Sequence, residues 1–184
     1  MSVGLSPVRP RSLMQRRHFL IASAAVTAGV ALGSLSWWAE ALAGEHFAVA
    51  RSDAEWQRLL GPARYAILRG GSTERPFTSA LLHEARRGQF ACAGCRAPLF
   101  SSQTKFDSGT GWPSFWAPLP HAIRTRADRS YGLTRTEVLC AACGGHLGHV
   151  FHDGPAPTGL RYCLNGLALF FQPTSPAPAA FRAL

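Results

Sequence analysis

The chain has 184 residues, a formal net charge of +9 and a hydrophobic content of 47%. That content excludes a wholly disordered protein, and the 18 glycines and 13 prolines disfavour a long helical bundle. The basic residues are spread along the chain with no run of five like charges, so a nucleic-acid partner is not expected.

Residues 1–43 have the composition of an export signal. Arg16 and Arg17 precede a stretch, residues 18–39, that contains no lysine, arginine or acid. The adjacent arginines resemble the twin-arginine signal, and small residues at both recognition positions fit cleavage after Ala43. The alternative is an uncleaved membrane anchor, because about 20 apolar residues span a bilayer. In both cases we expect a periplasmic domain, which is membrane-anchored if the signal is not cleaved.

Two short helices are expected at the start of the remaining chain. Ser52 and Glu55 have the spacing of a capping box, which predicts a helix start. Gly61 and Pro62 predict its end. A second helix is expected to start at a Thr or Ser cap near residue 78 and to run toward residue 88.

From Phe90 onward, short apolar runs are interrupted by Gly, Pro and Asp, which is typical of antiparallel strands and loops. We therefore predict one mainly β domain over residues 45–172, with its helices first and its sheets after. Residues 173–184 are rich in Pro and Ala and are predicted to be a loose tail.

Four of the five cysteines form two C-x2-C pairs separated by 44 residues. The pairs are Cys92 with Cys95 and Cys140 with Cys143. Each pair on a tight turn can point two thiolates at one centre, so the two pairs predict one structural Zn²⁺ per chain with four sulfur ligands. Disulfides are an alternative that an exported protein permits. A thioredoxin-like redox pair is another, although it would require a C-x2-C on a strand-to-helix turn.

The fifth cysteine lies in a predicted strand. Alternation places Arg161, Cys163 and Asn165 on one face of that strand. If the preceding segment pairs with it as a hairpin, His149 lies opposite Cys163 and Phe151 opposite Arg161, although a slip of one residue would turn the histidine away. Positive neighbours favour the nucleophilic thiolate, so the sequence favours a reactive cysteine over an inert core residue.

Glycines and aromatic residues are concentrated over residues 105–116, which predicts an exposed loop that presents rings. Trp112 or Trp116 is expected to form the floor of an apolar pocket. Phe106 and Phe115 are assigned to the core.

Together these segments resemble the type B methionine sulfoxide reductases, which reduce the R epimer of methionine sulfoxide. The resemblance covers about residues 55–171. Besides the two cysteine pairs, the matching segments are residues 65–69, 73–77, 105–115, 135–138, 146–151, 153–155 and 161–165. The resemblance implies a mainly antiparallel fold of two sheets, with short helices on the N-terminal side and a structural zinc site.

The resemblance also implies roles for individual residues. These are Cys163 as the nucleophile, Trp112 and Phe151 as substrate contacts, His146 and His149 as groups that bind or protonate the sulfoxide oxygen, and Asn165 and Arg161 as groups that order the site. The chemistry suits these residue types, because a thiolate attacks the electrophilic sulfur while the leaving oxygen needs a proton donor. The cysteine then becomes a sulfenic acid, which a second thiol must reduce.

The chain departs from the family pattern at Thr110, where many members carry a resolving cysteine. We therefore expect recycling by an external thiol, such as a thioredoxin-like protein. We also expect a monomer that acts on oxidised proteins or peptides. Two other functions stay open: a zinc-stiffened binding module of the same fold without turnover, and an exported thiol peroxidase.

Overall fold

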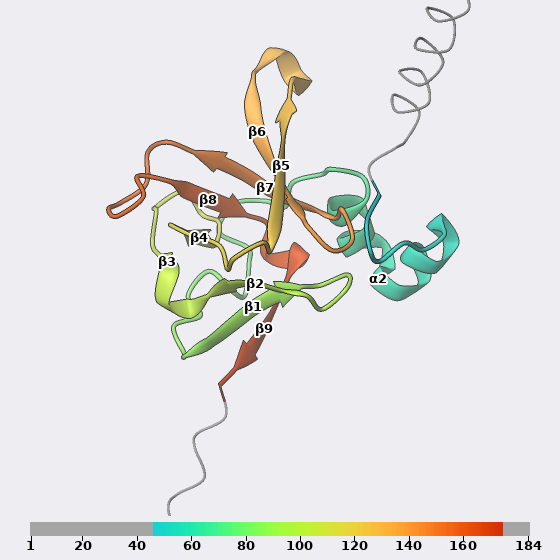
Figure 1. Ribbon diagram of the computed structural model, residues 1–184, viewed down its shortest axis with the longest axis horizontal. Coiled ribbons are helices and arrows are strands. Elements are labelled where there is room, and N and C mark those ends of the chain that lie inside the picture. Colours follow the sequence, from blue (N-terminus) through green and yellow to red (C-terminus); the bar gives the residue numbers. More distant parts are fainter. Residues whose placement is uncertain (1–45, 175–184) are drawn as a thin grey trace, which may run out of the picture. The chain divides into compact units, whose positions relative to one another are not determined.

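Two antiparallel sheets and one helix make up the part of the chain that the computed structural model describes, residues 46–174 (Figure 1). The predicted fold class, mainly β with two antiparallel sheets, is confirmed. The export signal predicted over residues 1–43 and the predicted tail beyond Thr174 lie outside the described residues. Within residues 46–174, no helix combines the length and the apolar composition needed to cross a membrane.

The helix α2 (Asp53–Leu68) begins at the capping box that the sequence predicts. The Ser52 hydroxyl accepts the Glu55 N–H at 3.4 Å, and the Glu55 carboxylate accepts the Ser52 N–H at 2.9 Å. The predicted end at Gly61 is confirmed in the backbone, because Gly61 is non-helical, at φ 66° and ψ 171°, and α2 consists of two helical segments joined across this kink. Pro62 permits this since it lies in the first turn after the kink, where a backbone N–H has no helical partner.

The second predicted helix, over residues 78–88, does not form: the segment makes a turn, and the first strand begins at Gly88. The Leu82 N–H donates to the Ser79 carbonyl at 3.1 Å, a bond that spans only three residues. The Leu82 carbonyl, which a helix would reserve for an N–H four residues later, accepts the Lys105 ammonium at 2.7 Å. A contact from a distant part of the chain therefore overrides the local helix signal.

The smaller sheet has three strands in the order β2-β1-β9, namely β1 (Gly88–Cys92), β2 (Pro98–Ser101) and β9 (Leu169–Pro173). Strand β9 runs one residue past the predicted domain boundary at 172, because Pro173 pairs with Gly88 and the Thr174 N–H donates to the Arg87 carbonyl at 2.9 Å. A proline is tolerated at the end of an edge strand, where its missing N–H leaves no gap in the ladder.

The larger sheet has six strands in the order β3-β4-β8-β7-β6-β5. They are β3 (Lys105–Phe106), β4 (Ser114–Phe115), β5 (Ile123–Asp128), β6 (Arg135–Cys140), β7 (His146–Phe151) and β8 (Arg161–Leu164). The hairpin of β7 and β8 has the predicted register, with His149 opposite Cys163 and Phe151 opposite Arg161. Strands β5 and β6 form a long hairpin that projects beyond the other strands (Figure 1).

Aromatic rings from both sheets form the core. Phe90 and Phe100 of the smaller sheet pack against Phe115 of the larger one, with ring centroids 4.9 and 4.7 Å apart, and Phe100 lies 5.6 Å from Tyr162. Phe115 is fully buried, as predicted, whereas Phe106 is only partly buried. Each buried ring contributes roughly 1.5–3 kcal/mol relative to its exposed state, so this cluster holds the two sheets together.

Candidate active site and metal centre

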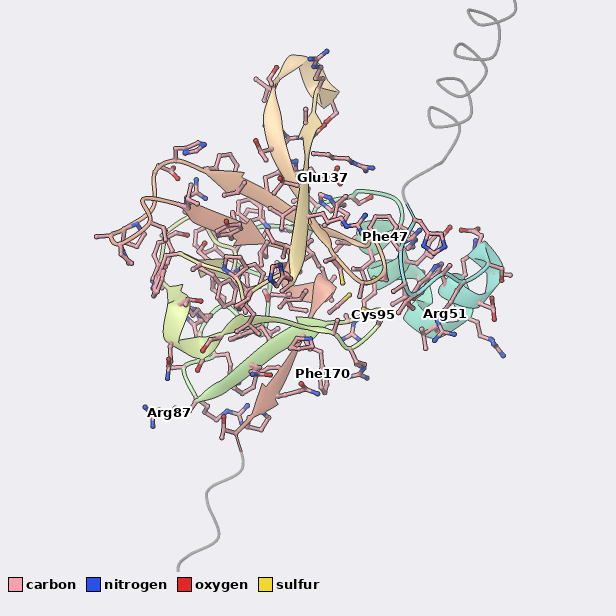
Figure 2. All side chains as sticks on the ribbon, viewed as in Figure 1. Phe47, Arg51, Arg87, Cys95, Glu137 and Phe170 are labelled. Atoms are coloured by element: carbon pink, nitrogen blue, oxygen red, sulfur yellow. The ribbon has the colours of Figure 1, made fainter. Side chains whose placement is uncertain are left out.

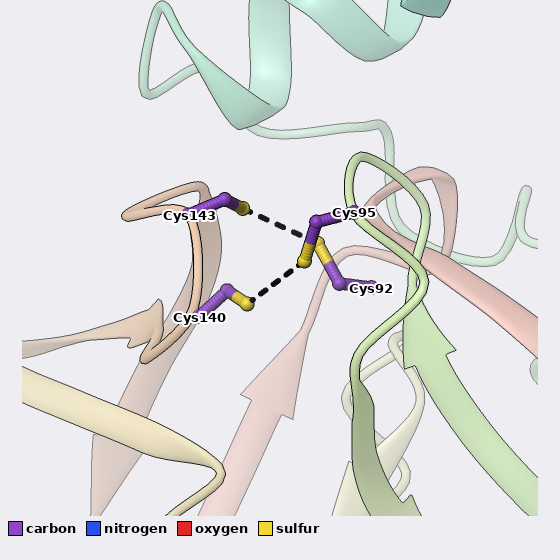
Figure 3. Close-up of side chains that lie close together, drawn as sticks. All are labelled: Cys92, Cys95, Cys140 and Cys143. Carbon is purple, nitrogen blue, oxygen red and sulfur yellow. Dashed lines mark hydrogen bonds between the residues drawn. The ribbon is translucent and has the colours of Figure 1, made fainter. Parts of the chain in front are cut away.

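Four sulfur atoms from two turns converge on one point (Figure 3). The turn between β1 and β2 provides Cys92 and Cys95, and the turn between β6 and β7 provides Cys140 and Cys143. The four sulfurs lie within 4.8 Å of one another, with 3.7 Å between Cys92 and Cys143 and 3.5 Å between Cys95 and Cys140. A tetrahedral zinc with Zn–S bonds of about 2.3 Å separates its sulfurs by about 3.8 Å, so this donor set fits zinc.

The two other interpretations of the cysteine pairs, disulfides and a thioredoxin-like redox pair, do not match this geometry. All five cysteines are free thiols, so the disulfide reading is not borne out. Both C-x2-C turns connect strand to strand rather than strand to helix, which differs from the setting of a thioredoxin-like pair. The helix α2 packs beside the cluster, where the Arg69 guanidinium donates to the Cys143 carbonyl at 3.1 Å.

Cys163 lies half-buried in a pocket of about 140 Å³. The pocket is lined by Thr73, Trp112, Arg135, Gly148, His149, Phe151, Cys163, Leu164 and Asn165. Its apolar wall combines two aromatic rings with Leu164, and its polar wall includes an imidazole. The pocket can therefore bind a small apolar group beside a nucleophilic thiol and a proton carrier.

Trp112 and Asn165 are both held by Glu74. The Trp112 indole N–H donates to the Glu74 carbonyl at 3.1 Å, and the Glu74 N–H donates to the Asn165 side-chain oxygen at 3.0 Å. The Glu74 carboxylate in turn accepts the N–H groups of Gly166 and Leu167, the latter at 3.1 Å. Glu74 thus ties the tryptophan to the chain just after Cys163, a role that the sequence analysis did not assign to it.

Asn165 is buried, and its amide N–H donates to the Leu147 carbonyl at 3.2 Å. Both ends of its side chain are therefore used to join the loop around Glu74 to strand β7. These contacts fix the Asn165 side chain, and its role in ordering the site stays a prediction.

Arg161 stands behind Phe151 rather than in the pocket lining. Its guanidinium makes a two-pronged contact with Asp153, at 2.9 and 2.8 Å, and lies 4.4 Å from the centre of the Phe151 ring. The Asp153 carboxylate, followed by the negative charge that Cys163 can carry, raises the pKa of Arg161 against the opposing effect of burial. Arg161 is thus a fixed positive charge that orients a pocket ring.

Thr110 lies where the family pattern would place a resolving cysteine. Its hydroxyl is 3.7 Å from the Cys163 sulfur and 2.8 Å from the Ser108 hydroxyl, which in turn lies 2.7 Å from the Ser114 hydroxyl. The thiol therefore meets a chain of hydroxyl groups, which can hydrogen-bond to it but cannot form a disulfide.

The two predicted histidines occupy different surroundings. His149 lines the pocket with Cys163, and its Nε2 lies 2.7 Å from the Asp128 carboxylate. His146 is buried next to it, with ring centroids 5.5 Å apart, and its Nδ1 lies 2.6 Å from the carboxylate of Glu137. Glu137 lies on β6 and is labelled in Figure 2. His146 does not line the small pocket but a polar cavity of about 630 Å³ that His149 also lines.

Burial and hydrogen bonding set the charges of these groups. Burial lowers the pKa of His146, and the hydrogen bond to Glu137 offsets only part of that effect. Burial also raises the pKa of Glu137, but the hydrogen bonds from Arg126 and His146 outweigh it, so the net pKa is lowered. Hydrogen bonds from Ser130 and then His149 hold the pKa of Asp128 well below its ordinary range. Both carboxylates are therefore ionised at neutral pH.

The structure thus brings Cys163, His149, Trp112, Phe151 and Asn165 to one pocket, while His146 and Arg161 support it from outside. Trp112, rather than Trp116, lines that pocket. The sequence analysis missed the carboxylates of Glu74, Asp128 and Glu137. A carboxylate at a strand position, as in β5 and β6, is a weak signal on its own, since solvated strand faces carry many.

Comparison with known proteins identifies the family. The SelR domain matches residues 60–173. Peptide methionine sulfoxide reductase MsrB of Agrobacterium fabrum is 53% identical over 126 residues, which cover 68% of this chain and 93% of that protein. The enzymes of the same name from Thiobacillus denitrificans and Leifsonia xyli are 54% and 55% identical, over 67% and 69% of this chain and 94% and 93% of their own lengths. The chain therefore belongs to the SelR family, the type B methionine sulfoxide reductases.

Proposed function

We propose that this protein is a peptide-methionine (R)-S-oxide reductase that acts on methionine sulfoxide in oxidised proteins or peptides. The observation that carries the proposal is the pocket in which a half-buried thiol, Cys163, lies with Trp112 and His149. The names of the relatives, peptide methionine sulfoxide reductase, support the same reaction.

In the proposed reaction the S-methyl group of the substrate packs on Trp112, whose face is apolar and polarisable. The Cys163 sulfur attacks the sulfoxide sulfur, and the thiol proton is delivered to the sulfoxide oxygen. The sulfoxide S–O bond breaks, a new S–O bond forms on Cys163, and the thioether leaves. Cys163 loses two electrons and becomes a sulfenic acid, while the substrate sulfur gains two.

We further propose that an external thiol, for example a thioredoxin-like protein, reduces this sulfenic acid. Thr110 supports this part of the proposal because it occupies the place of an internal resolving thiol. The four remaining cysteines are proposed to hold one structural Zn²⁺, which stabilises the fold and leaves no ligand position for the substrate.

Export by residues 1–43, a periplasmic location and a monomeric state are part of the same proposal. A fusion of residues 1–43 to a reporter that is active only after folded export tests the signal. Loss of export after replacing Arg16 and Arg17 with lysine supports the twin-arginine route, whereas unchanged export contradicts it.

The reaction is tested with purified protein, dithiothreitol and a peptide that carries each epimer of methionine sulfoxide. We expect reduction of the R epimer alone, and complete loss of turnover in Cys163→Ser with unchanged zinc content and circular dichroism. Tight binding of the peptide by wild-type protein without turnover would indicate a binding module. Consumption of hydrogen peroxide without sulfoxide reduction would indicate a thiol peroxidase.

A further inference from the structure

A polar cavity adjoins the pocket that contains Cys163 and shares lining residues with it. Its lining residues are Gly70, Gly71, Ser72, Thr73, Arg126, Asp128, Ser130, Arg135, Glu137, His146 and His149. Thr73, Arg135 and His149 line both the cavity and the pocket. His149 therefore borders both the pocket that holds the Cys163 thiol and a polar space of about 630 Å³.

The carboxylate of Asp128 fixes the tautomer of His149. An ionised carboxylate can only accept hydrogen bonds, and Asp128 stays ionised because Ser130, His149 and Arg135 all bond to it. The His149 Nε2, 2.7 Å from that carboxylate, must therefore carry the hydrogen. The lone pair of neutral His149 is then on Nδ1, and His149 is one of the residues that line the pocket with Cys163.

The carboxylate of Glu137 fixes His146 in the opposite tautomer. Glu137 is bonded by Arg126 at 2.5 Å and by the His146 Nδ1 at 2.6 Å, so Nδ1 carries the hydrogen. The lone pair is then on the Nε2 of His146. That atom is fully buried, has no hydrogen-bond partner within the described residues, and belongs to a side chain that lines the polar cavity.

A buried nitrogen without a protein partner, in a side chain that lines a polar cavity, indicates a water site. Leaving such an acceptor unsatisfied costs about 1–3 kcal/mol, and the cavity has ample room for water. The Nε of Arg135, a donor that lines the same cavity, is likewise buried and without a partner among the described residues. An acceptor and a donor without protein partners thus both belong to side chains that line a space that water can fill.

We propose that Asp128 and Glu137 are positioning residues that hold the two histidines in opposite tautomers and so give them different roles. His149, held by Asp128, carries the thiol proton of Cys163 on Nδ1 to the sulfoxide oxygen. His146, held by Glu137, binds water through Nε2 in the polar cavity and links the site to solvent protons. This inference rests on the proposed sulfoxide reductase activity, but the tautomers themselves do not.

The charged and titratable groups around His149 come from three neighbouring strands and its own. Asp128 approaches from β5, Arg135 and Glu137 from β6, His146 from β7 and Cys163 from β8. Arg135 and Arg126 each pair with one carboxylate, at 2.8 and 2.5 Å. Removing one carboxylate charge therefore leaves its arginine close to a histidine and disfavours the imidazolium.

Nitrogen-15 NMR of the imidazole rings tests the tautomers without substrate. At pH 8 we expect His149 with hydrogen on Nε2 and His146 with hydrogen on Nδ1, the signals being assigned by His149→Gln and His146→Gln. Asp128→Asn is expected to shift His149 toward the Nδ1–H form, because the amide can donate to Nε2, and Glu137→Gln is expected to shift His146 alone. The same tautomer on both rings in the wild-type protein would overturn the proposal, even if the variants fail to fold.

Single-turnover reduction of the peptide sulfoxide supplies the second measurement. We expect Asp128→Asn to slow the chemical step by about 10²- to 10⁴-fold, with little change in KM. In other enzymes, loss of a general acid, or of the carboxylate that holds a histidine in its correct tautomer, slows the reaction by about this factor. Asp128→Glu should recover part of the rate because it keeps the carboxylate. Glu84→Gln is the matched control, since Glu84 pairs with Arg86 at the surface.

An equal loss in Asp128→Asn and Asp128→Glu, with unchanged tautomers, would reduce Asp128 to a structural role. Wild-type protein that shows the tautomers but no turnover would refute the proposed function alone.

Discussion

Trp112 shows how a few contacts place one residue of the pocket. Its indole N–H is fixed by the Glu74 carbonyl, so the ring is held at the pocket and cannot turn freely. Cys163 and His149 are placed differently, by the pairing of two strands. The pocket therefore depends on one loop contact and one strand register, and these can be tested separately.

Replacing Trp112 with alanine should weaken substrate binding more than it alters the pH profile. The ring provides an apolar face and has no titrating group, and loss of such a contact raises KM by about 10- to 200-fold. Steady-state kinetics from pH 6 to 9 measure both effects. Trp112→Phe is the control that keeps an aromatic face but loses the hydrogen bond to Glu74. Its KM should lie between those of the wild-type protein and Trp112→Ala. An unchanged KM with a displaced pH optimum would show that Trp112 does not bind the methyl group.

Recycling of Cys163 can be tested at Thr110. Without reductant, wild-type protein should form about one methionine per chain, because one thiol supplies one electron pair on reaching the sulfenic acid. Thr110→Cys should form a disulfide with Cys163, since the Thr110 hydroxyl lies only 3.7 Å from the sulfur. Mass spectrometry after one turnover distinguishes the two products. Ser108→Cys is the matched control and should form none, and a disulfide in the wild-type protein with release of zinc would contradict recycling by an external thiol.

At the scale of elements, the β7–β8 hairpin determines which side chains meet Cys163. His149 of β7 and Cys163 of β8 are aligned because the two strands approach closely, and Gly148 of β7 allows this approach. A Cβ added at Gly148 would lie 2.1 Å from the Cys163 carbonyl oxygen and 3.0 Å from the Leu164 Cα. These are backbone atoms, so the strand rather than a side chain would have to move.

Gly148→Ala should therefore lower both stability and activity. Overpacking of this kind costs roughly 1–3 kcal/mol, and the displaced strand carries Cys163, the proposed nucleophile. Urea unfolding and turnover number measure the two effects. Gly159→Ala in the same hairpin is the control: its φ is +69° but an added Cβ meets nothing within 4 Å, so it should cost about 1 kcal/mol of strain and leave turnover unchanged. Equal turnover in the two variants would refute the role of close strand approach.

The elements also show what a sequence can and cannot predict. The register that pairs His149 with Cys163 follows from alternation and a hairpin centred on its loop, both of which are local. The missing helix after Ser79 depends on Lys105, which is distant in the sequence and takes a carbonyl that a helix needs. The carboxylate partners of the histidines could not be predicted for a similar reason. Asp128 meets His149 only because β5, β6 and β7 lie side by side in the sheet.

For the whole molecule, the cysteine cluster is the second link between the two sheets, besides the aromatic core. One turn of each sheet supplies two sulfurs, so a bound zinc joins the β1–β2 turn to the β6–β7 turn. The second turn lies between Glu137 and His146, and the metal is therefore expected to brace the hairpin that carries them.

Replacing one zinc ligand should destabilise the whole domain rather than the pocket alone. Because metal binding is coupled to folding, Cys95→Ser should lose zinc and stability on the order of several kcal/mol. Zinc content and thermal unfolding are the measurements. Cys163→Ser makes the same atomic change outside the cluster and should keep both at the wild-type level. A stable Cys95→Ser variant without metal would contradict a structural zinc.

Stability should also fall on mild acidification, because the pKa of His146 is lower in the folded state than its ordinary value of 6.5. The unfolded chain then binds the His146 proton more readily, so this contribution to stability is fully present above about pH 6.5. It is lost as the pH falls through the folded pKa. The midpoint of urea unfolding should therefore decrease between pH 7.5 and 5.5, and His146→Gln should flatten that decrease while a zinc indicator shows that metal stays bound. An identical slope in the two proteins would contradict this assignment.

Because Cys163 lies apart from the other four cysteines, the number of active sites in a preparation can be titrated with a thiol reagent. If the other four sulfurs hold the proposed zinc, one half-buried thiol is open to alkylation, and it lies in the proposed substrate pocket. One equivalent of a fluorescent maleimide would thus label each working chain once and silence it. The dye signal gives the concentration of competent enzyme in a preparation, and protection from labelling by added peptide reports occupancy of the pocket directly.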